Sequence, residues 1–383
     1  MLTPGVIIHI TPEVLTKEKN KPFYSVKLIF QEHWNDYLKT HKVREIERIE
    51  VEKMLSCKDA SRGGFWYYCK NCNEYVFVSF GCNSRLCSCC GKRYTDQWAS
   101  MLAERLDKNV FHRHLVFGIP DMLWKYFRED RKLYKILMDT AYKTIKKTFS
   151  RIKHQDIFLG VVEVYHPFGR DMKHQPHAHM ISTEGGYDKE GKFVSYGNYI
   201  PYNALHKYWE YDVLKVLRKH LPKGVVEEAY RRYPDGFCVY VRKDRISSRK
   251  GLAKYIGRYV RHPAIANTRI TAYNGEAVRF YWKDHDNKIH YKIMLAYDFI
   301  SAIIQHIPEK NQKLVRYYGA YSRRKKKCIK SGITKLNCMN LSEKRTSYCP
   351  NCHMKMDFVF YSKKDKPPDK NLLSNWLEMK KLS

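Results

Sequence analysis

The 383-residue chain contains no run of about 18 apolar residues, the length that a helix needs to cross a bilayer, so we expect no membrane-spanning segment. The stretch from Met1 to Lys19 holds one short apolar piece, Val6-Ile7-Ile8, which is too brief for a secretory signal. No internal repeat is visible in the sequence. These absences disfavour membrane, secreted and solenoid architectures, and they predict a folded cytoplasmic protein.

Acidic residues are scarce relative to basic ones. The chain has 39 Asp and Glu residues against 71 Lys and Arg residues, which gives a formal net charge of +32. A soluble domain needs a net charge of only about 2–8 in magnitude, so this excess indicates a polyanionic partner, most simply nucleic acid. The 30 tyrosines favour single strands, whose bases stack on aromatic rings. A hydrophobic fraction of 44% predicts a folded chain.

Seven of the twelve cysteines lie between Cys57 and Cys90. In a chain without a secretory signal, such clustering is typical of metal binding rather than of disulfides. Two Cys-x2-Cys knuckles predict one structural Zn²⁺ with four thiolate ligands: Cys69, Cys72, Cys87 and Cys90. Cys57 and Cys82 have two interpretations, as ligands of a second ion or as small buried residues. Cys89 adjoins a knuckle and is an alternative to Cys90.

A second group of cysteines lies near the C-terminus. It predicts either another zinc ribbon or unpaired knuckle-like residues in a tail: Cys328, Cys338, Cys349 and Cys352. A basic run that starts with Arg323 and Arg324 precedes this group. Because the whole chain is strongly basic, we interpret the run as an arm that binds DNA phosphates; the alternative is a solvated run of charges.

The spacing of apolar residues predicts helices and strands without strict alternation. Helices are expected at 24–56 (two helices), 94–106, 129–152, 202–219, 223–232, 247–259 and 297–306. Strands are expected at 111–119, 157–165, 176–182, 237–241, 277–283 and 288–295. This pattern indicates an α+β fold in which helices flank a largely antiparallel sheet.

Two histidines, His177 and His179, are spaced to share one side of a strand, because strand side chains repeat with period two. Such a pair can hold Mg²⁺ or Mn²⁺ and leave positions open for phosphate oxygens. The same spacing in His112-Arg113-His114 shows that the motif alone is weak, but the apolar neighbours of the first pair favour it. For the third ligand we rank His166, at the end of the preceding strand, just above Glu163, which lies earlier on that strand and whose carboxylate would suit a hard cation.

Two tyrosines, Tyr255 and Tyr259, are spaced to share one face of a helix that begins at Ser247 or Ser248. A phenol has a pKa of about 10 and needs activation, which a metal beside the scissile phosphate and basic neighbours can supply. The basic neighbours expected to contact DNA are Lys254, Arg258 and Arg261. The alternative is an ordinary amphipathic helix with aromatic side chains toward the core. Beside the histidine pair, the catalytic interpretation is favoured.

The chain resembles the rolling-circle insertion-sequence transposases with paired tyrosines, which belong to the HUH endonuclease superfamily. Each motif is modest, but their shared order along the chain is specific. The resemblance rests on Cys57, Gly63-Gly64, Cys69-Lys-Asn-Cys72, Cys82-Asn-Ser-Arg-Leu-Cys87, Cys90, His114-Leu-Val-Phe-Gly-Ile-Pro120, His166-Pro-Phe-Gly169, Pro176-His-Ala-His179, Tyr255-Ile-Gly-Arg-Tyr259, Val315-Arg-Tyr-Tyr-Gly319 and Cys349-Pro-Asn-Cys352. It implies a structural role for His114, in the first strand of the sheet.

The resemblance implies an HUH-type catalytic domain at 106–320, an N-terminal helical and zinc-binding DNA-binding domain at 1–105, and a basic C-terminal region at 321–383. It also implies a prokaryotic transposase, associated with the nucleoid when bound to DNA, that nicks and rejoins single-stranded DNA through 5′-phosphotyrosine links. Its partners would be element ends and target DNA, and its cofactors catalytic Mg²⁺ or Mn²⁺ and structural Zn²⁺.

Three alternatives share part of this pattern. A plasmid or phage replication initiator uses the same nicking chemistry. A zinc-dependent DNA-binding protein would lack catalysis, and a metallohydrolase would activate water at the histidines. The sequence predicts no oligomeric state.

Overall fold

The computed structural model describes residues 8–9, 24–195, 202–242, 248–260, 264–284, 286–322 and 347–362. Six residues with a predicted role lie outside these ranges: Ser247, Arg261, Arg323, Arg324, Cys328 and Cys338. Within the described ranges, no helix is both long and apolar enough to cross a bilayer.

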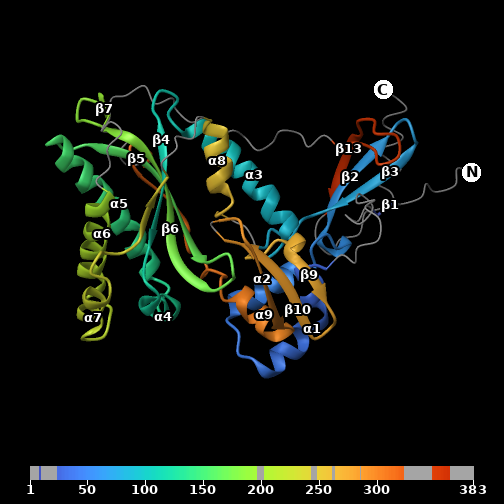
Figure 1. Cartoon of the computed structure of the whole chain (residues 1–383). Coiled ribbons are helices and arrows are strands. Elements are labelled where there is room, and N and C mark those ends of the chain that lie inside the picture. The colour runs from blue at the N-terminus through green and yellow to red at the C-terminus, as the bar shows by residue number, and fades with distance from the viewer. Residues whose placement is uncertain are drawn as a thin grey trace, which may run out of the picture.

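The largest sheet carries the paired histidines and is antiparallel throughout (Figure 1). Its strands, in spatial order, are β12 (Val315–Gly319), β5 (Phe158–Phe168), β6 (His174–Tyr187), β4 (His112–Gly118) and β8 (Val239–Val241), with β7 (Phe193–Ser195) paired to β6. Strand β6 continues through Gly185-Gly186, beyond the predicted end at Ser182. A Cβ at Gly185 would lie 2.3 Å from the Val194 carbonyl oxygen, so the glycine lets β7 approach rather than ending the strand.

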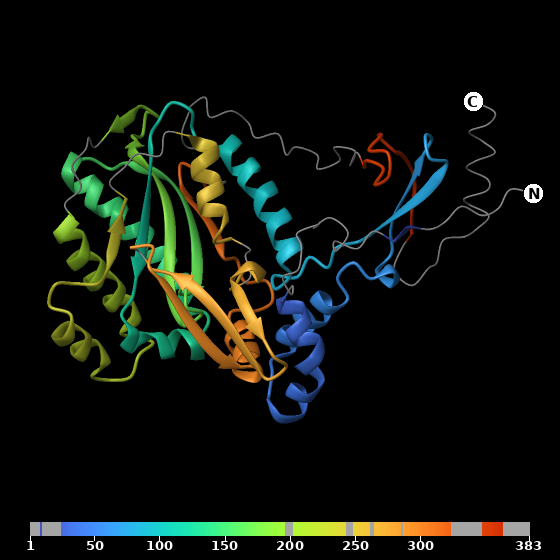
Figure 2. The same cartoon turned by 45° about the vertical axis from the view of Figure 1, so that its right-hand side comes forward.

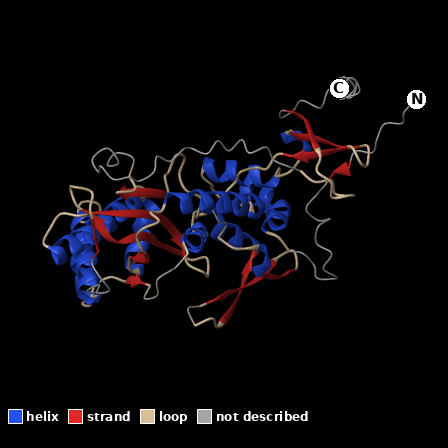
Figure 3. Ribbon diagram, turned by 90° about the horizontal axis from the view of Figure 1, so that it is seen from above, coloured by secondary structure: helices blue, strands red, loops and turns tan. Residues whose placement is uncertain are grey.

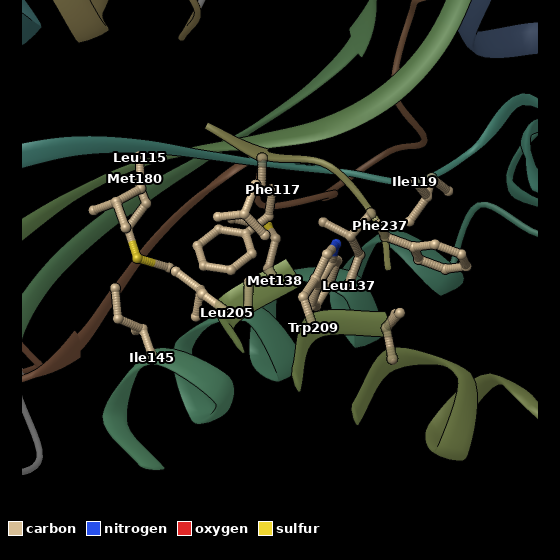
Figure 4. Close-up of a cluster of buried hydrophobic side chains, with 14 of the residues drawn as sticks. Leu115, Phe117, Ile119, Leu137, Met138, Ile145, Met180, Leu205, Trp209 and Phe237 are labelled. Carbon is tan, nitrogen blue, oxygen red and sulfur yellow. The ribbon is translucent and has the colours of Figure 1, made fainter. Parts of the chain in front are cut away.

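Helices cover one face of this sheet and enclose the main hydrophobic core (Figure 4). They are α4 (Asp121–Glu129), α5 (Leu133–Lys153), α6 (Tyr202–Leu217) and α7 (Val225–Arg232). Leu115 and Phe117 of β4 point into this core toward Trp209 of α6. The Trp209 indole donates a hydrogen bond to the Gly118 carbonyl at 2.7 Å, which fixes the helix to the strand end. A core this continuous stabilises the sheet that holds the site.

Two further helices cover the opposite face: α3 (Ser88–Arg105) and α8 (Arg249–Gly257). Val162, Val164 and Ile181 of the sheet pack against apolar residues of both helices. A Cβ on Gly257 would lie 3.2 Å from the Thr95 side chain, so glycine allows α8 to lie close against α3. Since both faces are covered, β5 is apolar over most of its length instead of alternating.

A second core joins the N-terminal helices to a later part of the chain. Helices α1 (Val26–Thr40) and α2 (Glu45–Leu55) pack with α9 (Ala296–Ile304) and a three-stranded antiparallel sheet: β11 (Ile289–Leu295), β10 (Ala277–Lys283) and β9 (Ile270–Tyr273), which follows the 3-10 turn η3 (Asn267–Arg269). This core therefore contains residues from both sides of position 105, where the sequence predicts a domain boundary.

The third sheet belongs to the cysteine-rich module, and Figure 3 shows the three sheets as separate groups of strands with helices between them. Its strands are β1 (Ile8–His9), β3 (Glu74–Ser79), β2 (Gly64–Cys69) and β13 (Asp357–Ser362), and the 3-10 turn η2 (Ala60–Arg62) precedes β2. The C-terminal strand β13 thus lies beside an N-terminal hairpin (Figure 2). The predicted α+β class, with antiparallel sheets flanked by helices and an N-terminal cysteine-rich module, is confirmed.

Candidate functional site

Three histidines meet on the face of the large sheet that α3 and α8 cover. His166 of β5 lies directly opposite His177 of β6, and His179 follows two residues later on the same face. The Nε2 atoms of His177 and His179 are 3.1 Å apart, and His166 Nδ1 lies 3.3 Å from His177 Nε2. One nitrogen from each ring lies within 4.8 Å of the others, so the three can share one metal ion.

The protonation of the triad suits metal binding. Burial lowers the pKa of His177 to about 4 and that of His179 well below its ordinary value, so both rings are neutral near pH 7. His177 Nδ1 donates to the Gln175 carbonyl at 2.7 Å, which leaves the Nε2 lone pair for the ion. His179 Nδ1 lies 3.0 Å from His114 Nε2, which can accept a hydrogen bond from it. Such outer contacts fix the tautomer of a ligand and orient its ring.

His114 therefore has a role that its spacing with His112 does not reveal. On β4 it lies diagonally across from His179, since Ile181 is its direct partner in the ladder. His114 contacts the candidate ligand His179 but does not belong to the triad of His166, His177 and His179. His112 instead bonds to the hydroxyl of Tyr321. The ranking of the 177/179 pair above the 112/114 pair agrees with this geometry.

Glu163, the alternative third ligand, lies away from the triad. Strand alternation places it on the opposite face of β5 from His166, where Arg316 of β12 is its partner in the ladder. Its carboxyl group is fully buried, and neither oxygen has a hydrogen-bond partner among the described residues. Burial raises the pKa of Glu163 well above its ordinary value. The structure thus corrects the sequence-based alternative and leaves His166 as the third histidine.

The paired tyrosines lie at the end of α8. Ser248 is one of the two predicted caps. It caps the helix by accepting a hydrogen bond from the Gly251 amide at 3.2 Å. The helix ends at Gly257, two residues before the predicted end, but tighter turns continue it. The Tyr259 amide donates to the Ile256 carbonyl at 3.0 Å. The two tyrosines consequently remain on one face, with hydroxyl oxygens 3.4 Å apart.

Both tyrosine rings contact the histidine cluster. The ring of Tyr259 stacks on His179 with centroids 3.6 Å apart, and it meets His166 edge-on at 5.1 Å. The ring of Tyr255 meets His114 edge-on at 5.0 Å. Burial, together with the hydrogen bond to Tyr255, raises the pKa of the Tyr259 phenol. The sheet and the helix therefore bring the two predicted motifs into one site.

Basic side chains surround the tyrosines. The guanidinium groups of Arg242 and Arg258 lie 5.7 and 5.9 Å from the Tyr255 ring centroid. Lys254 and Arg258 are exposed on α8, where they can meet a phosphate backbone. The sequence does not point to Arg242 as a site residue. Its backbone amide donates to the His114 carbonyl and so continues the β4–β8 pairing, which no local pattern indicates. A cavity beside Tyr259 is lined by Arg85 among other residues.

Within the part of the chain that the structure describes, eight cysteines form two groups of four, and neither group is the predicted one. The first contains Cys57, Cys82, Cys87 and Cys90, with sulfur–sulfur distances from 3.5 to 3.8 Å. The second contains Cys69, Cys72, Cys349 and Cys352. Cys89 is exposed and belongs to neither group, so it does not replace Cys90.

The β2–β3 hairpin explains the division. Its two strands pair from Gly64–Ser79 at the base to Cys69–Glu74 at the tip, a span of roughly 17 Å for five steps along a strand. Cys69 and Cys72 lie at the tip, while Cys82 follows the base and Cys87 precedes α3. One ion cannot reach both ends. Cys57 and Cys82 are therefore members of a tetrathiolate group, and the predicted tetrad is wrong.

Comparison with known proteins places these features in one family. The family described as "Transposase zinc-binding domain" matches residues 29–119, and the family described as "Putative transposase" matches residues 160–328. The first contains the N-terminal cysteines, and the second contains the triad and both tyrosines. The fold and site thus define a transposase with an N-terminal zinc-binding domain, an enzyme that acts on DNA.

Two curated relatives support the assignment. The chain is 30% identical to "Transposase for insertion sequence element IS801" from Pseudomonas savastanoi pv. phaseolicola over 312 residues, which cover 76% of the chain and 74% of the relative. It is 25% identical to "Putative transposase y4qJ" from Sinorhizobium fredii (strain NBRC 101917 / NGR234) over 314 residues, 76% and 78% of the two chains. No solved structure matches. The chain belongs to the IS91-type insertion-sequence transposases.

Proposed function

We propose that this transposase cuts and rejoins single-stranded DNA at the ends of its element through Tyr255 and Tyr259. Mg²⁺ or Mn²⁺ would be held by His166, His177 and His179. The observation that carries the proposal is the direct stacking of Tyr259 on His179, because it places a phenol beside the nitrogens that can hold the ion. If the two tyrosines only packed against an apolar core, they would not need three imidazoles facing one another beside them.

The three nitrogens fit a divalent ion because they converge. His177 and His179 also have their other ring nitrogens engaged, by the Gln175 carbonyl and by His114. When bound, such an ion supplies positive charge to the oxygens of a phosphate, which favours attack at phosphorus. The histidines come from one side only, so phosphate oxygens can take the remaining positions. Arg242 and Arg258 add positive charge at Tyr255 and favour the phenolate and the bound strand.

In the proposed cleavage step, the phenolic oxygen of one tyrosine forms a bond to phosphorus and gives up its proton. The bond between phosphorus and the 3′ oxygen breaks, and that oxygen takes up a proton. The products are a free 3′ hydroxyl and a 5′-phosphotyrosine. The new ester conserves the energy of the phosphodiester bond, so attack by a 3′ hydroxyl can reverse the step and release the phenol. No nucleotide triphosphate is needed.

The second phenol gives the site a second nucleophile. With hydroxyl oxygens 3.4 Å apart, the two tyrosines can act on successive phosphates while the first covalent link is kept. A basic chain of net charge +32 can hold the strand between the two events. This arrangement suits the transfer of a strand from an element end to a target.

The proposal is tested with labelled single-stranded oligonucleotides that carry the element ends. His177→Ala with His179→Ala should abolish nicking and spare DNA binding, because the ligands are lost while the basic surface remains. Retained cleavage in this variant would show that the proposed metal ligands are not needed for nicking. Cleavage by the wild type without any covalent adduct on a denaturing gel would favour a hydrolase that activates water.

A further inference from the structure

Four cysteines, two from the N-terminal hairpin and two from the C-terminal segment, lie close together in a second group. We infer that Cys69 and Cys72, at the tip of the β2–β3 hairpin, bind a structural Zn²⁺ together with Cys349 and Cys352 of the C-terminal segment. Cys72 and Cys349 are 277 residues apart in sequence. The zinc-binding family matches residues 29–119 and thus contains only half of this site.

The sulfur positions suit a tetrahedral ion. Cys69 and Cys352 have sulfurs 3.5 Å apart, and Cys72 and Cys349 have sulfurs 3.8 Å apart. A tetrahedron with Zn–S bonds of about 2.3 Å has edges of about 3.8 Å, whereas a disulfide needs about 2.05 Å. All four sulfurs lie within 4.8 Å of one another. The distances therefore match a shared ion and exclude a disulfide between these pairs.

The two halves of the site have the same local backbone. Each is a Cys-x2-Cys turn, and the residue after each turn adopts a left-handed conformation: φ is 56° at Asn73 and 57° at His353. In the C-terminal turn, the His353 amide donates to the Cys349 carbonyl at 2.9 Å. Two matching knuckles that face each other are the arrangement that a zinc ribbon uses to present four thiolates. The repetition in two unrelated segments indicates a common ligand.

Contacts around the site hold the two segments together. Strand β13 pairs antiparallel with β2, with Asp357 opposite Tyr68 and Ser362 opposite Gly64. Phe360 stacks on Trp66 with centroids 6.0 Å apart. Next to the knuckles, Lys70 forms an ion pair with Asp357 at 3.1 Å, and the side-chain amide of Asn351 donates to the Glu74 carboxylate at 2.8 Å. The C-terminal segment 347–362 is thus an integral part of the N-terminal zinc module, which the ion closes.

Zinc content tests the site directly in the full chain. The wild type should contain two zinc ions per chain by elemental mass spectrometry, and Cys349→Ser with Cys352→Ser should contain one. The remaining ion, on the Cys57 group, shows that the variant has kept the rest of the module. Loss of both ions in this variant, or of neither, contradicts the assignment.

A matched control uses the other two C-terminal cysteines. Cys328→Ser with Cys338→Ser should keep two zinc ions, because the structure completes the site without them. If this control loses an ion while Cys349→Ser with Cys352→Ser keeps both, the ion belongs to a different set of cysteines and the proposed site is wrong.

A second experiment tests whether the ion joins the two ends. A recognition sequence for a specific protease is inserted within 323–346 of the full chain, which is then cleaved and passed over a size-exclusion column. The C-terminal fragment of the wild type should elute with the rest of the protein. The fragment carrying Cys349→Ser and Cys352→Ser should separate at least in part. Separation of the wild-type fragment with its zinc still bound would overturn the inference.

Discussion

The ring of Tyr259 stacks on the ring of His179, with centroids 3.6 Å apart and planes 17° from parallel. The two residues are 80 positions apart in sequence, on a helix end and on a strand, and each comes from a different motif. Their contact joins the predicted nucleophile to the predicted metal ligands.

Changing one tyrosine at a time should separate their contributions. Tyr255→Phe and Tyr259→Phe each keep the ring contacts with His114 and His179 but remove one nucleophile. The double variant should form no covalent adduct with single-stranded DNA, while each single variant should retain attack by the remaining phenol. Denaturing gels with labelled oligonucleotides measure this. An adduct in the double variant would show that neither phenol is the nucleophile.

His114→Ala should weaken metal binding without removing a ligand. His114 Nε2 lies 3.0 Å from His179 Nδ1 and can accept a hydrogen bond from it, and loss of such an outer contact costs about 10–100-fold in metal affinity. The Mn²⁺ concentration for half-maximal nicking should rise by that factor, and excess Mn²⁺ should restore the rate. His112→Gln is the control. His112 is on the same strand as His114 but bonds to the Tyr321 hydroxyl, so its replacement should leave the metal requirement unchanged. No rescue by metal would argue against a positioning role.

The ligand set predicts a preference between the two candidate ions. Mg²⁺ takes oxygen ligands almost exclusively, whereas a transition ion accepts imidazole nitrogen more readily. Three histidine nitrogens should therefore give half-maximal nicking at a lower concentration of Mn²⁺ than of Mg²⁺. Titration of both ions against nicking of one oligonucleotide measures the difference. Tighter use of Mg²⁺ would indicate that an oxygen ligand outside the triad contributes.

Glu163 should make stability depend on pH. Because burial raises its folded-state pKa, the folded chain keeps a proton that the unfolded chain loses above about pH 4.3. The wild type should thus lose about 1.4 kcal/mol relative to Glu163→Gln for each pH unit between the unfolded and folded pKa values. Urea unfolding at pH 5, 6 and 7 measures this. A difference that stays constant with pH would contradict a protonated Glu163.

Elements with a strong local pattern were predictable from the sequence. The histidine strand, the capped tyrosine helix and the helices at 26–40 and 45–55 have apolar spacing or caps that local physics can recognise. Strand β12 has no clear strand pattern in the sequence, because its half-buried residues do not alternate between apolar and polar. The helix predicted at 129–152 overlaps the end of α4 and most of α5, and residues 130–132 separate these two helices.

The grouping of the cysteines depends on contacts that local spacing does not contain. The sequence pairs knuckles that are near in the chain, 69–72 with 87–90, but the hairpin holds them at opposite ends. The true neighbours of Cys69 and Cys72 come from the turn that precedes β13, after a separation of more than 270 residues. Likewise, Arg242 reaches Tyr255 only because β8 pairs with β4. Such relationships are properties of the tertiary fold.

Mapping the covalent link tests the central claim most directly. The wild-type chain is incubated with single-stranded element ends and Mn²⁺, digested with a protease, and examined by peptide mass spectrometry. The proposed chemistry predicts a nucleotide attached through its 5′ phosphate to Tyr255 or Tyr259. Cleaved DNA with no linked peptide, or a link to a residue outside α8 and the turn that follows it, would contradict the proposal.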